Sequence, residues 1–247
     1  MSSFLFVTDL ENTLVGDDDA LKTLNHQLAK HRERFKTKIV YATGRSLYLY
    51  RLLAREKSLL TPDALITSAG TEMYFTEEDS FDLEWAKVLS QGWDREDIMD
   101  IASNCPELES QPKSEQNPFK ISYYLAQAVA ERVLRKLNAD LTARGYEIQI
   151  FYSAGQDLDL LPKNGDQSLA VEFLRDRWNI GAKKTIVCGD SGNDIALFQR
   201  EEKGIIVGNA KPALMQWYAN NKSESIYCAE ASCAGGILEG LKHFSFL

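Results

Sequence analysis

The chain has 247 residues, of which 44% are hydrophobic and 26% charged, as expected for a globular protein with one large domain or a domain carrying an insert. Its formal net charge of −8 offers no basic field to nucleic acid or anionic lipid, so we expect neither partner. The four cysteines form no C-x-x-C pair, and no uninterrupted apolar run approaches the ~18 residues of a membrane-spanning helix. The N-terminus lacks a signal-peptide pattern, so we expect free thiols and a cytoplasmic protein.

The first part of the chain alternates short apolar runs with amphipathic segments. Strands are predicted at 3–9, 38–42 and 64–67, and helices at 17–35 and 46–60. In the first helix Leu21, Leu24 and Leu28 share one face. Alternating strands and helices with short connections are typical of a parallel sheet, so the predicted fold class is α/β.

The pattern changes after about residue 78 and returns later. Short helices at 83–89 and 94–102 precede a polar loop at 106–118, and a long helix at 127–144 lies between alternating strands at 119–125 and 147–152. Strands around a helix indicate an inserted α+β module at 80–155 with an antiparallel sheet. The parallel pattern then resumes as helix 167–178, strand 185–188, helix 194–199, strand 204–207, helix 212–220, strand 225–228 and helix 236–243.

Acidic residues follow two of the predicted core strands. Asp9 closes the run 4–8, and Asp190 and Asp194 follow the run 185–188. The carboxyl ends of parallel strands border a common crevice, where buried carboxylates need a positive partner. Mg²⁺ prefers oxygen ligands and is often shared with phosphate, so a magnesium site is predicted there. With that charge present, the Asp9 carboxylate could attack a phosphate ester.

Thr43, Gly44 and Arg45 follow the second predicted strand. A hydroxyl and exposed backbone N–H groups beside a helix N-terminus form a cradle for an anion. Thr43 could equally be only a helix cap before a glycine turn. Arg45 could hold phosphate or a polar substrate, or it could be a solvated surface side chain.

Five segments together resemble the haloacid dehalogenase-like phosphatases, and among them the sucrose-phosphate phosphatases. These segments are 9–17, 41–46, 115–122, 157–162 and 187–194, and the similarity runs nearly end to end. The block at 115–122 is the one more specific to the sucrose branch. The resemblance implies a Rossmann-like core formed by 1–79 and 156–247, and a substrate-specificity cap formed by 80–155. It also implies Mg²⁺-dependent hydrolysis of sucrose 6-phosphate through an aspartyl phosphate.

The same resemblance implies roles for single residues. Asp9 is expected to be the nucleophile, Glu11 the acid/base, and Thr43 a ligand of the phosphoryl oxygens. Magnesium is expected at Asp9, at the backbone carbonyl of Glu11, and at Asp190 and Asp194. Substrate binding is expected from Gly44, Arg45, Glu115, Gln116, Asn117, Lys120 and Asn193.

Two positions depart from the family pattern. The family normally has aspartate where this chain has Glu11, and the extra methylene displaces a group that must lie within hydrogen-bond reach. A displacement of about 1 Å can reduce a rate about 10²-fold. The family expects a lysine where this chain has Gln167, which donates a hydrogen bond but carries no charge. Lys163 is either a substitute for that lysine or a solvated turn residue.

These departures leave three functions open. The first is a magnesium-dependent phosphatase acting on sucrose 6-phosphate with reduced turnover. The second is a non-catalytic protein that binds sucrose or sucrose phosphate and regulates sucrose-phosphate synthase, its expected partner. The third is another sugar-phosphate branch, such as mannosyl-phosphoglycerate hydrolysis.

Overall fold

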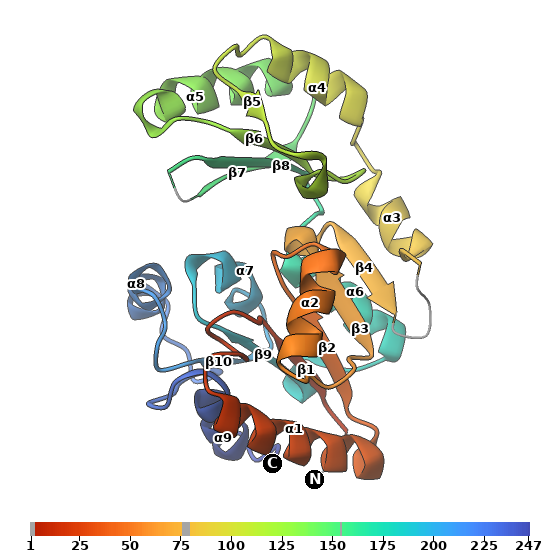
Figure 1. Cartoon of the computed structure of the whole chain (residues 1–247), viewed down its shortest axis with the longest axis vertical. Helices are drawn as coiled ribbons and strands as arrows, with labels where there is room; N and C mark the ends of the chain where they lie inside the picture. The colour runs from red at the N-terminus through yellow and green to blue at the C-terminus, as the bar shows by residue number, and fades with distance from the viewer. Residues whose placement is uncertain (1–2, 76–79, 154) are drawn as a thin grey trace. The chain divides into compact units, whose positions relative to one another are not determined.

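The computed structural model describes residues 3–75, 80–153 and 155–247, which form two compact units (Figure 1). The core unit contains Met1–Ser80 and Gln167–Leu247, and the insert unit contains Phe81–Asp166. The second boundary therefore lies after Asp166 rather than at the expected residue 155. The reason is that residues 157–162 form a strand of the insert's sheet, whereas the core was expected to resume at residue 156.

A seven-stranded sheet runs through the core unit. In sheet order its strands are β11 (Ile226–Cys228), β10 (Lys203–Ile206), β9 (Thr185–Gly189), β1 (Leu5–Thr8), β2 (Lys38–Ala42), β3 (Ala64–Thr67) and β4 (Glu72–Phe75). All neighbours pair in parallel except β3 and β4. The predicted α/β fold with a mostly parallel sheet is confirmed. Strand β4 was not predicted, because the reversal before it uses left-handed φ values at Ser68 and Ala69 that are rare for these residue types.

Helices cover both faces of this sheet. One face carries α1 (Asp18–Phe35), α2 (Leu47–Glu56) and α9 (Cys233–His243), which share a core cluster with the inward side chains of β1, β2, β9 and β10. The opposite face carries α7 (Ile195–Phe198). Phe198 of α7 lies against Gly204 of β10, whereas the next residue of that strand, Ile205, contacts α9 on the first face. Helix α6 (Gln167–Trp178) packs beside α7, and α8 (Pro212–Asn220) follows β10. Burial on both faces explains why the strands read as continuous apolar runs.

The order of the strands reverses at β1. The chain proceeds from β1 through β2 to β3 on one side, whereas β9, β10 and β11 extend on the other side. In open α/β sheets, ligands bind in the crevice outside the carboxyl ends of the strands at such a switch point. The residues that follow β1, β2 and β9 are therefore the first candidates for a functional site.

The insert unit is an α+β module. Its antiparallel sheet has the order β5 (Glu109–Ser110), β6 (Ile121–Tyr124), β8 (Asp157–Pro162) and β7 (Ile148–Ser153). Helices α4 (Arg95–Ser103) and α5 (Gln127–Ala143) bury one face of this sheet, and α3 (Leu83–Leu89) begins the unit. Side chains alternate along a strand, so Ser122 and Asp159 belong to the face that these helices do not cover. The remaining short helices are η1 (Ser68–Gly70), η2 (Lys113–Glu115), η3 (Ala182–Lys184) and η4 (Gly192–Asp194).

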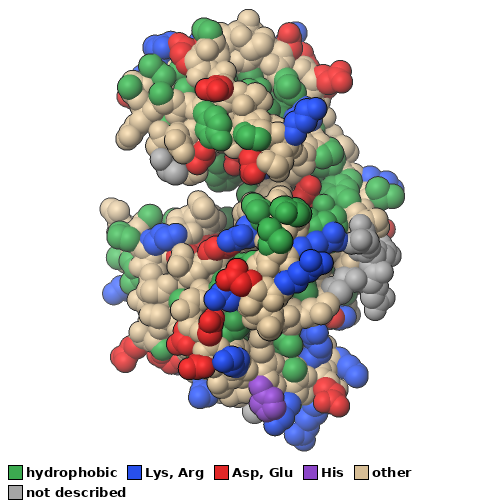
Figure 2. Space-filling model, in the orientation of Figure 1, with side chains coloured by type: hydrophobic (Ala, Val, Ile, Leu, Met, Phe, Trp, Pro, Cys, Tyr) green, Lys and Arg blue, Asp and Glu red, His purple; other side chains and the backbone are tan. Residues whose placement is uncertain are grey.

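The surface agrees with the modest acidic balance of the sequence. Acidic and basic side chains are interspersed over the face of the core unit in Figure 2, without a continuous basic area on that face. All four cysteines are free. Across residues 3–75, 80–153 and 155–247, none of the helices has the length and apolar character needed to cross a bilayer.

Candidate active site

Three carboxylates converge beyond the ends of β1 and β9. Asp9 follows β1, Asp190 follows β9 and Asp194 lies in η4; one oxygen from each lies within 4.8 Å of the others. Parallel pairing of Thr8 with Cys188 produces this approach, and the backbone N–H of Asp9 donates to the Cys188 carbonyl at 3.1 Å. Residues far apart in the sequence thus form one acidic cluster, which we call the carboxylate cluster (Asp9, Asp190 and Asp194).

Burial makes the carboxylate cluster unfavourable when all its members are charged. Desolvation raises the pKa of Asp9 well above its usual range, and the negative charges of Asp194 and Asp190 raise it further. Burial also raises the pKa of Asp194 to about 6, although the backbone N–H groups of Ser191 and Asp190 donate to its Oδ2. A cation bound among these groups would relieve the repulsion.

The donor set fits a hard divalent cation. Asp190 is only 2% exposed, and its Oδ2 atom accepts no hydrogen bond. Its other oxygen accepts from the Thr13 hydroxyl at 3.4 Å. Several carboxylate oxygens, one of them buried without a donor, are ligands that Mg²⁺ binds.

We expect the metal-free protein to lose stability as the pH rises through about 6. The folded state raises the pKa of Asp194 from 3.8 to about 6, so its contribution is fully present below pH 3.8 and lost above pH 6. This rise corresponds to about 3 kcal/mol of unfolding free energy at 1.36 kcal/mol per pH unit. Urea unfolding in chelator between about pH 3.5 and 7 measures it. Asp194→Asn should make the profile shallower but not flat, because the raised pKa of Asp9 also favours low pH. The exposed Asp19→Asn should leave the profile unchanged, and an unchanged profile in Asp194→Asn would contradict the assignment.

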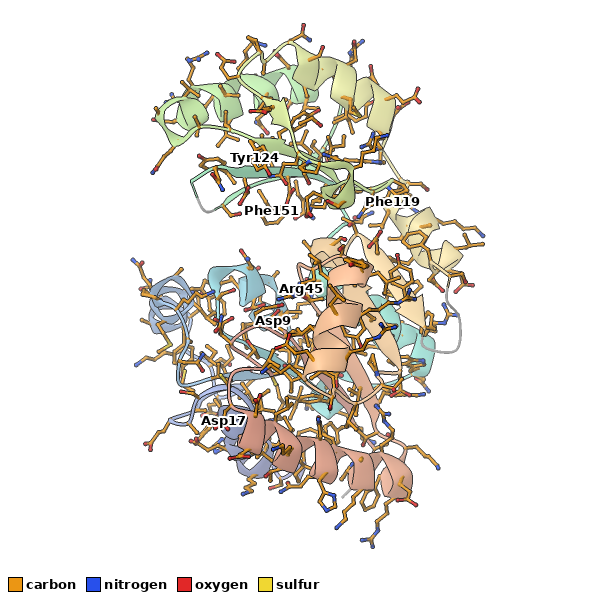
Figure 3. All side chains as sticks on the ribbon, viewed as in Figure 1. Asp9, Asp17, Arg45, Phe119, Tyr124 and Phe151 are labelled. Carbon is orange, nitrogen blue, oxygen red and sulfur yellow. The ribbon has the colours of Figure 1, made fainter. Side chains whose placement is uncertain are left out.

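Glu11 is engaged by two residues that follow β2. The Nε of Arg45 donates to one carboxylate oxygen of Glu11, and the Thr43 hydroxyl donates to the other at 3.4 Å. The Arg45 backbone N–H donates in turn to the Thr43 hydroxyl at 3.2 Å. Figure 3 places Arg45 near Asp9 at this edge of the core unit. Arg45, expected to bind substrate, therefore forms an ion pair with Glu11. Gly44, also expected to bind substrate, has open space beside it, since a Cβ added there would meet no atom within 4 Å.

The two candidates for the basic motif lie in different units. Gln167 is the first residue of α6 in the core unit; it is 8% exposed, and its Oε1 accepts no hydrogen bond. Lys163 lies in the insert unit, where its ammonium pairs with Glu147 and most of its side chain is exposed. Asn193, expected to bind substrate, is exposed in η4 next to Asp194.

The loop after β10 holds two residues that the sequence interpretation missed. Asn209 donates to the Asn12 carbonyl at 2.7 Å and accepts from the Cys233 backbone N–H at 2.8 Å, so it fixes the loop that follows Asp9. Lys211 places its Nζ 3.5 Å from Asp190 Oδ2. The predicted strand 204–207 ends at the same sheet edge as β1 and β9. From this position alone, the loop after it could have been predicted to lie near the site.

The insert unit contains a buried polar network on its open sheet face. Lys120 is 7% exposed, and its Nζ lies 3.5 Å from Asp159 Oδ1. The Ser122 hydroxyl donates to the same oxygen at 2.5 Å and is also 3.0 Å from the Glu115 carbonyl oxygen. Asp159 was not singled out from the sequence, although its alternation with buried Leu158 and Leu160 is readable there.

The other expected sugar-binding residues have local structural partners. The Gln116 amide donates to the Ser122 carbonyl at 2.7 Å and accepts from its N–H at 3.0 Å. The Asn117 side chain accepts from the Phe119 backbone N–H at 2.8 Å. Tyr124 and Phe151, labelled in Figure 3, are 39% and 48% exposed on this unit. The open face thus combines polar groups with aromatic surface.

The chain is similar to known phosphatases over almost all its length. The family profile described as Sucrose-6F-phosphate phosphohydrolase matches residues 2–245. A protein of Arabidopsis thaliana described as "Probable sucrose-phosphatase 2" is 37% identical over 249 residues, covering 97% of this chain and 59% of that protein. The mannosylfructose-phosphate phosphatase of Agrobacterium fabrum is 31% identical over 241 residues, covering 97% and 96%. The chain therefore spans about 59% of the plant relative's length.

A solved structure shares the fold. The sucrose-phosphatase of Synechocystis sp. PCC6803, crystallised in complex with sucrose and phosphate, superposes with a TM-score of 0.86 at 38% identity. The match covers 99% of both chains. The likeness therefore includes both the core unit and the insert unit.

Proposed function

Since the chain belongs to the sucrose-6F-phosphate phosphohydrolase family, we propose that it hydrolyses sucrose 6-phosphate to sucrose and phosphate. The observation that carries this proposal is the convergence of Asp9, Asp190 and Asp194 at the switch point of the sheet. The similarity to a sucrose-phosphatase crystallised with sucrose and phosphate supports the choice of substrate.

Mg²⁺ is the proposed cofactor. The carboxylates of Asp9, Asp190 and Asp194 would hold it together with the backbone carbonyl of Glu11, as the buried oxygen of Asp190 without a donor suggests. When bound, it offsets the negative charge of the carboxylates and of the phosphoryl group.

The reaction needs a nucleophile and an acid that later acts as a base. The Asp9 carboxylate attacks phosphorus, forming an oxygen–phosphorus bond to Asp9 while the bond to the sugar oxygen breaks. Glu11 must first leave its ion pair with Arg45 and be protonated. It then gives this proton to the departing oxygen and later takes a proton from the water that attacks the aspartyl phosphate, which frees Asp9 and releases phosphate. The Thr43 hydroxyl and the Gln167 amide would donate to the phosphoryl oxygens. Lys163, paired with Glu147 in the insert, is left without an assigned role.

The insert unit is proposed to select the sugar. Its open sheet face carries the ion pair of buried Lys120 with half-buried Asp159, and Ser122 is hydrogen-bonded to Asp159. Such groups can exchange hydrogen bonds with hydroxyls, and the exposed rings of Tyr124 and Phe151 offer apolar surface to a sugar ring. Glu115, Gln116 and Asn117 would shape this surface. In the core unit, Gly44, Arg45 and Asn193 are proposed as substrate ligands.

Phosphate release from sucrose 6-phosphate tests the function. We expect release with Mg²⁺ and its loss in chelator, restored by added Mg²⁺. Glucose 6-phosphate, fructose 6-phosphate and mannosylfructose phosphate should compete poorly, and the last of these distinguishes the activity that the Agrobacterium relative's name describes. Saturable binding of sucrose 6-phosphate without any phosphate release would instead support the regulatory role, with the synthase as the partner to examine.

A further inference from the structure

Lys211 brings a positive charge to the carboxylate cluster. Its Nζ lies 3.5 Å from Asp190 Oδ2, the buried oxygen that accepts no hydrogen bond. Its backbone N–H donates to the Asp190 carbonyl at 2.7 Å, so the loop is anchored to the same residue by its main chain. Among the residues that the structure describes, Lys211 is thus the cation that forms an ion pair with a member of the carboxylate cluster.

The position of Lys211 is unfavourable for its own helix. It is the N-cap of α8, and its side chain makes no capping hydrogen bond. N-caps favour side chains that accept from the first turn, and the positive end of the helix dipole repels a cation. Pro212 already supplies the preferred first helical residue, so the stability of α8 does not explain a lysine at position 211. Residues that break a local rule in this way are often retained for a function.

The carboxylate cluster needs more positive charge than a divalent cation supplies. It contains three carboxylates, and the incoming phosphate adds further negative charge. The family expects a lysine at 167, where this chain has a buried, uncharged glutamine whose Oε1 has no donor. We propose that Lys211 supplies from the β10 loop the positive charge that is missing at position 167. The inference rests on the proposed function, in which phosphate binds beside this cluster.

Lys211 then acts through its charge beside Asp190. Since 57% of its side chain is exposed, it can give way to a cation at Asp190 Oδ2 and still keep its charge beside the site. Two opposite effects follow. Lys211 competes with Mg²⁺ for one oxygen, and it attracts the phosphate that binds after the metal. A purely structural role for Lys211 would produce neither of these two effects.

The test measures binding as well as turnover. In Lys211→Gln, calorimetric titration should show Mg²⁺ binding tightened about threefold to tenfold, while inorganic phosphate at saturating Mg²⁺ binds about tenfold more weakly. Lys211→Arg should keep both wild-type values, because the charge is retained. Lys222→Gln removes a charge from an exposed position after α8 and should change neither.

A double-mutant cycle then links positions 167 and 211. Gln167→Lys should restore phosphate affinity in Lys211→Gln but change it little in the wild type, so the two substitutions should be non-additive by about tenfold. Additive effects, or a Lys211→Gln variant with unchanged phosphate affinity, would overturn the inference. Because phosphate and Mg²⁺ binding are read without substrate, failure to hydrolyse sucrose 6-phosphate would count against the proposed function and not against this one.

Discussion

Asp9→Asn should abolish phosphate release from sucrose 6-phosphate. The amide has no anionic oxygen to attack phosphorus, and removal of the nucleophile in a serine hydrolase lowers kcat by about 10⁶-fold. The same substitution should raise the unfolding free energy of the metal-free protein at neutral pH. Asp9 is half-buried beside Asp190 and Asp194, and the desolvation and repulsion that raise its pKa disfavour its charged form.

The matched control is Asp17→Asn, labelled as Asp17 in Figure 3. Asp17 caps α1 by accepting from the backbone N–H groups of Asp19 and Ala20, and asparagine caps a helix equally well. This variant should keep wild-type turnover and stability. Steady-state phosphate release and urea unfolding check both variants. Turnover in Asp9→Asn near the wild-type value would mean that another group is the nucleophile.

Glu11→Asp should raise turnover by about 10²-fold, the change associated with a displacement of roughly 1 Å in an active site. Glu11 is held by Arg45 and Thr43, so its carboxyl group is directed toward the end of β2. The shorter aspartate side chain would draw the group back toward Asp9, where the departing sugar oxygen must receive its proton. The gain should appear in kcat, with little change in KM.

The comparison needs four proteins assayed side by side: the wild type, Glu11→Asp, Gln167→Lys and the double variant. If Lys211 already provides charge, Gln167→Lys alone should add little, and the double variant should resemble Glu11→Asp. Glu56→Asp makes the same change at an exposed site in α2 and should have no effect. A Glu11→Asp protein no faster than the wild type would show that Arg45 and Thr43 already hold the longer side chain productively.

The core of the fold could be predicted because its signals are local. Apolar runs alternating with amphipathic helices indicate a parallel sheet, and residues after such runs must meet at one edge. This reasoning led from the sequence to Asp9, Asp190 and Asp194 without knowledge of any contact. The residues after β2 were found in the same way.

Other features depend on contacts that no local pattern specifies. β8 contains Leu158 and Leu160 in alternation, but only its pairing with β6 and β7 assigns it to the insert. The ion pair between Glu11 and Arg45 joins two separate loops. Lys211 was not singled out because a lysine before a helix that begins with proline is typically a solvated residue. Only the pairing of β9 with β10 brings it close to Asp190.

The insert unit is one uninterrupted stretch, Phe81–Asp166, and every strand of the seven-stranded sheet comes from outside it. Under the proposed function, substrate preference and bond-breaking chemistry would be encoded in separable parts of the gene. A graft joined at residues 80 and 167 could bring a new sugar specificity onto an old catalytic scaffold. Such an exchange would leave the order of the core strands unchanged. The two junctions at residues 80 and 167 could therefore serve natural recombination and protein engineering alike.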